Sequence, residues 1–137
     1  MKLSLGATYA IYGLQFLARK YDNVVPVKKI AVVFKFPEKH LAKIFQNLVK
    51  AGLLKSERGI GGGFRLAKKP GEINLIDIIV AVDGPIIAKG CFLAQSDCKK
   101  LHICKTAKLI QDAQIRMIDT FRKITLEQLI DSDTDCQ

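Results

Sequence analysis

Residues 55–66 read KSERGIGGGFRL, and this stretch decides how the rest of the 137-residue chain is interpreted. Four glycines occupy positions 59–63, between two short pieces with strand character, directly after a basic helical segment. Glycine allows positive φ and a close approach of the backbone to another surface. The order therefore predicts a winged helix that binds DNA, with the hairpin tip against the phosphate backbone and Arg58 reaching into a groove.

A phosphate-binding loop of an NTPase is the competing interpretation of the same glycines. Such a loop follows a buried strand, opens a helix and carries a Lys-Ser/Thr pair. Here Gly63 runs directly into Phe64-Arg65-Leu66, so both the order and the content disagree with a nucleotide loop. The sequence favours the wing.

Two helices predicted before the wing make a helix-turn-helix. The first spans Val27 to Val33, and the second has Pro37 in its first turn and ends at Gly52. An amphipathic helix from about residue 5 to residue 21 precedes both. The outward residues of the second helix are all polar or basic, which suits a DNA major groove. These residues are Lys39, His40, Lys43, Gln46, Asn47 and Lys50.

The distribution of charge agrees with a polyanionic partner for the first part of the chain. The net charge is +9; residues 1–90 hold 15 Lys and Arg against 6 Asp and Glu, and residues 91–137 hold 7 against 7. A basic segment followed by a neutral one indicates nucleic acid binding by the former and another task for the latter. The alternative is a surface whose charge serves solubility alone.

The second part of the chain predicts helices and a pairing surface. Asn74 is expected to cap a helix that runs to about Val82. Thr125 and Gln128 form a capping box for a final short helix. Between these, a heptad seam predicts a long helix that pairs with another helix. The seam consists of Ile103, Ala107, Ile110, Gln114, Met117, Phe121 and Ile124.

These elements predict a mostly α fold with a small β-hairpin wing, that is, a winged helix-turn-helix domain plus a long dimerisation helix. We expect residues 1–83 to form the DNA-binding domain and 84–104 a cysteine-bearing loop. Residues 105–130 then form the dimerisation helix with its C-terminal cap, and 131–137 a disordered tail.

Three cysteines, Cys91, Cys98 and Cys104, lie within fourteen residues. Soft thiolates select iron–sulfur clusters, zinc or Cu(I), and no Cys-x-x-Cys pair favours zinc here. Three unconnected small apolar residues are the alternative. His102 is the nearest candidate for a fourth ligand, although an exposed histidine without a metal role is equally open. Cys136 is expected to be incidental.

The chain contains no apolar run long enough to cross a membrane and no signal-peptide cleavage pattern, so we expect a cytoplasmic protein without a membrane partner. Cysteines in that reducing compartment are expected to be metal ligands or redox-active thiols. No pair of carboxylates or other acid–base constellation indicates an enzyme.

From Met1 to about Ile130 the chain resembles the bacterial winged-helix transcription regulators of the IscR/NsrR/CymR family. The resemblance rests on Met1-Lys2-Leu3-Ser4 with Tyr9-Ala10, the segment Leu41 to Leu54, and the glycine-rich segment from Arg58 to Pro70. It rests further on the segment from Ile73 to Gly84, the three cysteines and Ile124-Thr125-Leu126.

The resemblance implies a homodimer whose long helices pair on double-stranded operator DNA. Many members bind a [2Fe-2S] or [4Fe-4S] cluster through cysteines that match Cys91, Cys98 and Cys104, and others bind none. Their fourth ligand is a histidine three positions after the last cysteine, or an acidic residue near the N-terminus of the partner. This sequence has Ala107 and Thr8 at those positions, so the type of cluster stays open.

The sequence thus predicts a homodimeric DNA-binding regulator that senses redox, nitric oxide or iron–sulfur status. A cluster-free regulator controlled by a protein partner or by thiol oxidation is the first alternative, and a small metal-carrying redox protein the second. The expected DNA contacts are Lys28, Lys39, His40, Lys43, Asn47, Arg58, Gly61 and Gly62.

Overall fold

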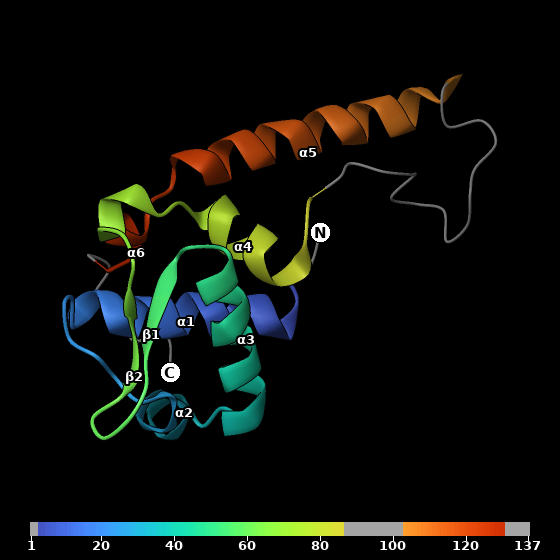
Figure 1. Cartoon of the computed structure of the whole chain (residues 1–137). Helices are drawn as coiled ribbons and strands as arrows, with labels where there is room; N and C mark the ends of the chain where they lie inside the picture. Colours follow the sequence, from blue (N-terminus) through green and yellow to red (C-terminus); the bar gives the residue numbers. More distant parts are fainter. Residues whose placement is uncertain (1–2, 87–102, 131–137) are drawn as a thin grey trace.

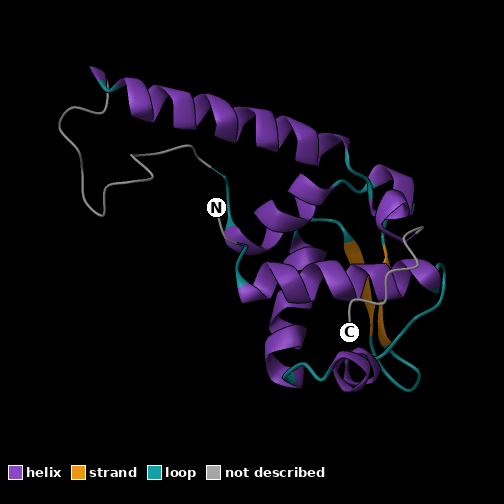
Figure 2. Ribbon diagram, turned by 180° about the vertical axis from the view of Figure 1, so that it is seen from behind, coloured by secondary structure: helices purple, strands orange, loops and turns teal. Residues whose placement is uncertain are grey.

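The structure is a computed structural model that describes residues 3–86 and 103–130. Its elements follow the order α1 (Leu5–Arg19), α2 (Val27–Phe34), α3 (Glu38–Lys50), β1 (Leu54–Glu57), β2 (Gly63–Leu66), the 3₁₀ helix η1 (Pro70–Glu72), α4 (Leu75–Asp83), α5 (Lys105–Lys123) and α6 (Leu126–Ile130). Figures 1 and 2 show a helical body with one small hairpin and a long helix across one end. The predicted fold class is confirmed.

Local side-chain caps explain where several helices begin. Ser4 Oγ accepts a hydrogen bond from the Ala7 amide at 3.0 Å, which caps α1. The Asn74 side chain accepts from the Asp77 amide at 2.9 Å, as predicted. The predicted capping box before α6 is also present: the Thr125 amide donates to Gln128 Oε1 at 2.9 Å, and the Gln128 amide donates to Thr125 Oγ1 at 3.3 Å.

Other boundaries differ slightly from the prediction. α1 ends at Arg19 rather than near residue 21, and Asp22 follows with a positive φ of 67°. Pro37 stands at the N-cap of α3 rather than inside its first turn. α3 does end where expected, because Gly52 after it has a φ of 78°.

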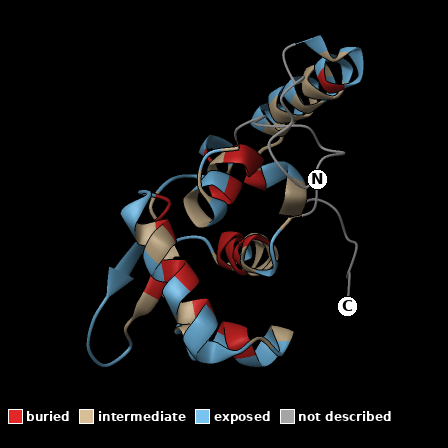
Figure 3. Cartoon of the chain, turned by 90° about the vertical axis from the view of Figure 1, so that its right-hand side faces the viewer, coloured by how far each residue is buried: buried red, intermediate tan, exposed pale blue. Residues whose placement is uncertain are grey.

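The core lies between α1, α3, α4 and α6. α1 contacts each of the other three helices. Fully buried residues from all four helices meet there, including Leu14, Phe45, Ile78 and Leu126. Figure 3 shows the buried segments turned toward the centre of the bundle. This core fixes α3 by its apolar face and leaves the opposite face of α3 exposed.

α5 lies along α4 and continues beyond the body of the domain (Figure 1). Backbone hydrogen bonds from Leu75 N to Ile124 O at 2.9 Å and from Leu126 N to Ile73 O at 2.8 Å fix its C-terminal end. The predicted seam is turned largely toward the body, since Ala107 is buried and Met117 and Phe121 are half-buried.

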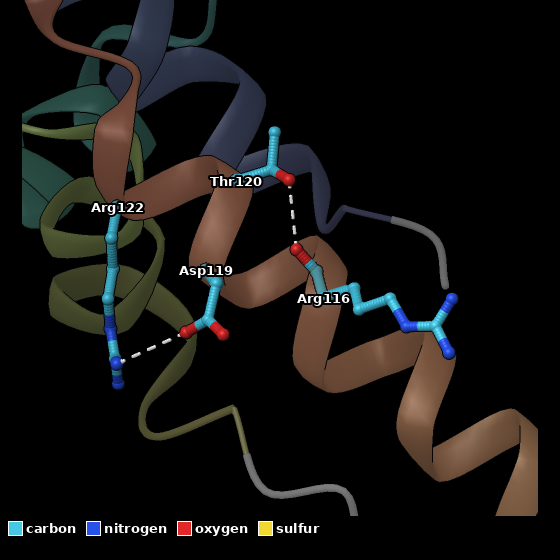
Figure 4. Close-up of polar contacts among 4 residues, drawn as sticks. All are labelled: Arg116, Asp119, Thr120 and Arg122. Atoms are coloured by element: carbon cyan, nitrogen blue, oxygen red, sulfur yellow. Dashed lines mark hydrogen bonds and ion pairs between the residues drawn. The ribbon is translucent and has the colours of Figure 1, made fainter.

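The second half of α5 also carries polar contacts at exposed positions. Asp119 and Arg122 form an ion pair at 3.5 Å, and the Thr120 hydroxyl donates to the Arg116 carbonyl at 2.9 Å (Figure 4). Both side chains of the ion pair are more than half exposed, so it contributes little stability. None of the helices in residues 3–86 and 103–130 is long and apolar enough to cross a membrane.

Candidate nucleic-acid interface

α3 has one buried face and one exposed face. Leu41, Ile44, Phe45 and Leu48 are buried against the core. The predicted outward residues Lys39, His40, Lys43, Gln46 and Lys50 are exposed, and Asn47 is half-buried. The side chains at helical spacing thus give α3 a polar, basic face without an apolar residue at its centre.

The turn between α2 and α3 is held by aromatic contacts. Lys35 has the left-handed conformation (φ 57°), and the Phe36 amide donates to Ala31 O at 2.9 Å. The Phe36 ring stacks on Tyr9 of α1 with centroids 4.0 Å apart, and the His40 and Tyr9 rings are T-shaped to each other with centroids 5.5 Å apart. These contacts orient the start of α3, and with it His40. The sequence did not predict the contribution of Tyr9 and Phe36, because they come from separate elements.

The wing is fixed beside the start of α2. Val25 and Phe64 exchange two backbone hydrogen bonds of 2.9 Å each, so the segment before α2 forms a bridge with β2. The Phe64 ring also meets Phe45 of α3 edge to face, with centroids 5.2 Å apart. Lys28, in the first turn of α2, is exposed near this base. β2 therefore touches α3 and the segment that leads into α2.

Sequence reasoning missed the Val25–Phe64 bridge. The two residues are far apart in sequence. The short apolar pair Val24-Val25 before Pro26 is the one local feature that indicates a strand-like segment there, and it is weak.

The wing itself is an antiparallel hairpin in which Leu54 pairs with Leu66 and Glu57 with Gly63. Its tip closes with a hydrogen bond from the Gly62 amide to Gly59 O at 3.0 Å. A Cβ atom on Gly62 would lie 2.4 Å from Glu57 O, so a side chain is excluded there. Gly61 has a φ of 76°, which favours glycine.

The two arginines of the wing have different surroundings. Arg65 Nε lies 3.2 Å from Glu57 Oε1, an ion pair without hydrogen-bond geometry. Arg58 is exposed at the tip and has no ion-pair partner within the described residues. Arg58 is therefore the arginine available to an anion.

The predicted cysteine ligands fall only partly within the described residues. Cys104 is half-buried at the N-cap of α5 and forms no disulfide with a described residue. Cys91, Cys98 and His102 lie outside the described residues. Within residues 3–86 and 103–130, no three His, Cys, Asp or Glu side chains converge as a metal site. A thiol where the chain enters α5, without a disulfide to any described residue, fits a soft-metal ligand.

Comparison with known proteins decides the family. The family model Rrf2, described as an iron-dependent transcriptional regulator, matches residues 3–132. The chain belongs to the Rrf2 family. The family resemblance found in the sequence is thereby confirmed, and with it the expectation of a DNA-binding transcription regulator.

Individual relatives of this Rrf2-family chain are also transcription regulators. It is 34% identical over 131 residues to the HTH-type transcriptional regulator IscR of Vibrio campbellii, covering 95% of this chain and 77% of the relative. It is 27% identical to NsrR of Halalkalibacterium halodurans, over 100% of this chain and 95% of that protein.

Solved structures share the fold over nearly the whole chain. CymR, the global cysteine regulator of B. subtilis, matches with a TM-score of 0.76 and 31% identity over 98% of this chain and 99% of that one. IscR of T. potens matches with a TM-score of 0.76 and 26% identity over 100% and 91%. The chain is thus a DNA-binding transcription regulator, like its relatives, and not an enzyme.

Proposed function

We propose that two copies of the chain bind a two-fold-symmetric operator, with α3 in the major groove and the wing in the adjacent minor groove. The observation that carries this proposal is the common orientation of three exposed parts. Figure 1 shows the wing tip, α2 and the start of α3 at one end of the domain, opposite α5. A winged helix-turn-helix needs this arrangement to follow a duplex surface.

Each exposed part then has its own role. Lys39, His40, Lys43 and Asn47 of α3 face the base edges and flanking phosphates of the major groove. At the wing tip, Arg58 enters the minor groove, and the backbone at Gly61 and Gly62 lies against phosphates. At the start of α2, Lys28 contacts a phosphate.

The dimer is proposed to form through α5. Three apolar side chains in α5 and just before it are not covered by their own chain: Ile103 is 68%, Leu109 69% and Ile115 51% exposed. Exposed apolar residues along a helix at the edge of a domain indicate a protein interface. A second copy of α5 supplies matching apolar residues and the two-fold symmetry of an operator.

The sensor is proposed to be an iron–sulfur cluster, [2Fe-2S] or [4Fe-4S], held by Cys91, Cys98 and Cys104, with His102 as the candidate fourth ligand. The iron dependence in the family's description supports it, as does Cys104, which forms no disulfide with a described residue. Such a cluster supplies a centre that reacts with oxidants or nitric oxide. Cys104 immediately precedes α5, so ligation there can bias the position of the pairing helix between two states with different affinity for DNA.

The test begins with protein prepared without oxygen. Its visible absorption, iron and sulfide content are measured, and duplexes are selected with it from a randomised DNA pool. We expect a coloured dimer that selects one two-fold-symmetric sequence and whose affinity changes when the cluster is removed. Protein that stays colourless after reconstitution with iron and sulfide, yet binds DNA, is a cluster-free regulator. Protein that holds metal but selects no duplex is a redox carrier.

A further inference from the structure

Ile60 is the most exposed large apolar residue of the described chain, at 109% relative exposure. It stands at the tip of the wing between Gly59 and Gly61. Its side chain gains no burial from its own chain. An isolated exposed isoleucine needs no explanation on most surfaces. At this tip, however, it stands two residues from Arg58, which has no ion-pair partner among the described residues.

The tip around Ile60 is narrow. Gly59 and Gly61 carry no side chains, and no described atom lies within 4 Å of the Cβ position of either. Both have positive φ, 99° and 76°, so larger residues are disfavoured there. The tip is therefore a backbone turn with one apolar side chain at its centre, which suits a minor groove about 6 Å wide.

The tip is also held in place before it meets a partner. The Gly62 amide closes the turn on Gly59 O at 3.0 Å, and the two hydrogen bonds between Val25 and Phe64 fix β2 beside the segment before α2. Little ordering of the wing is then needed on binding, which favours insertion of a side chain into a groove.

We infer that Ile60 is an apolar wedge that enters the minor groove beside Arg58 and partly unstacks one base step. The inference rests on the proposed DNA contact of the wing and specifies how that contact discriminates between sequences. Isoleucine is among the residues that insert between base steps from the minor groove. Pyrimidine–purine steps unstack most easily, so the wedge favours such a step beneath the wing. Arg58 supplies the charge that holds the tip on the duplex.

The test uses the full-length dimer and a duplex that the wild-type protein selects from a randomised pool, with 2-aminopurine at each step beneath the wing. In the wild-type complex we expect increased 2-aminopurine fluorescence at one step, which reports unstacking. Ile60→Ser should abolish this increase and weaken binding about 10-fold, since the apolar contact is lost. A pool selected with Ile60→Ser should lose the preference for a pyrimidine–purine step.

Ile60→Leu is the matched control, because it keeps an apolar side chain of the same size and should retain both the fluorescence and the affinity. Thermal unfolding of Ile60→Ser should match that of the wild type, since Ile60 is fully exposed. Equal affinity of Ile60→Ser and wild type overturns the wedge, as does a wild-type complex without increased fluorescence at any step. A wild-type protein that selects no duplex overturns the proposed function itself.

Discussion

At the scale of single residues, the two arginines of the wing have different expected roles. Arg58 is expected to contact DNA, and Arg65 belongs to an ion pair within the hairpin. Arg58 has no ion-pair partner in the part of the chain that the structure describes, and Arg65 is paired with Glu57. Arg58→Ala should weaken binding to the selected operator by about 10-fold or more, because a groove contact by arginine contributes on the order of 1–3 kcal/mol. Fluorescence anisotropy at several salt concentrations measures the change.

Lys123→Ala is the control for Arg58→Ala, since Lys123 is an exposed cation in the last turn of α5, and α5 lies at the end of the domain opposite the wing tip (Figure 1). It removes the same charge and should leave the affinity nearly unchanged. If both variants lose affinity equally, a general effect of net charge explains the loss, and the placement of Arg58 in a groove is wrong.

The sequence predicted the exposure of Arg58 from its position beside the glycines, but not the pairing of Arg65. That ion pair depends on the strand register. Lys55 is directly opposite Arg65, and Glu57, opposite Gly63, is the diagonal neighbour. A one-residue change in register would separate Arg65 from Glu57 and reverse the faces of the strand.

At the scale of elements, Gly63 joins the wing to the segment before α2. It has a φ of 156°, and a Cβ atom there would lie 2.3 Å from Val25 O. Gly63→Ala should therefore push the wing away from Val25 and break the bridge with Phe64. We expect a loss of about 2 kcal/mol in the free energy of unfolding, from the close contact and the strained φ together. Urea denaturation measures it.

Gly61→Ala is the matched control for Gly63→Ala. Its φ is also positive, 76°, but no described atom lies within 4 Å of the added Cβ. The cost should be limited to backbone strain, on the order of 1 kcal/mol. If Gly63→Ala is no less stable than Gly61→Ala, the bridge between β2 and Val25 does not fix the wing.

Helix starts and stops were largely predictable because their causes are local. Asn74 and the Thr125–Gln128 box lie within three residues of the amides they bind. The contacts that assemble the elements were not predictable, since they join distant residues. The hydrogen bond from Leu75 to Ile124 is one example, and it aligns α5 with α4. The heptad pattern of α5 identified its apolar face, but periodicity does not say whether that face meets its own chain or another.

At the scale of the whole molecule, the projecting part of α5 leads to a prediction about dimerisation. Leu109→Lys combined with Ile115→Lys should dissociate the dimer and abolish operator binding, because two charges would be buried between the helices. Both side chains are more than half exposed in the single chain, so helix content should be preserved. Sedimentation velocity and circular dichroism measure the two quantities.

Tyr21→Lys combined with Asn23→Lys is the control for this dimer variant. Both residues are exposed just beyond α1, and the substitution adds the same charge away from α5. The control should remain dimeric. Met117 and Phe121 are less suitable positions, since they are half-buried on the side of α5 that faces the body. A Leu109/Ile115 variant that stays dimeric would place the interface elsewhere.

The last prediction concerns the proposed cluster. Single Cys→Ser changes at Cys91, Cys98 and Cys104 should each lose or destabilise the visible chromophore, because the thiolates of one short segment cannot easily be replaced. The matched control is Cys136→Ser, thirty-two residues beyond Cys104, which should keep it. Absorption spectra with iron and sulfide analysis measure the result.

His102→Ala then examines the fourth ligand. A changed spectrum or faster loss of the cluster supports His102 as the fourth ligand, and an unchanged spectrum indicates another group.

Each cysteine variant is also assayed for binding to the selected operator. If the cluster biases α5 through Cys104, the apo form of the wild type and the three cysteine variants should share one altered affinity for DNA, since all four populate the same state. If variants that lose the chromophore keep the holoprotein's affinity for the operator, the cluster does not control DNA binding.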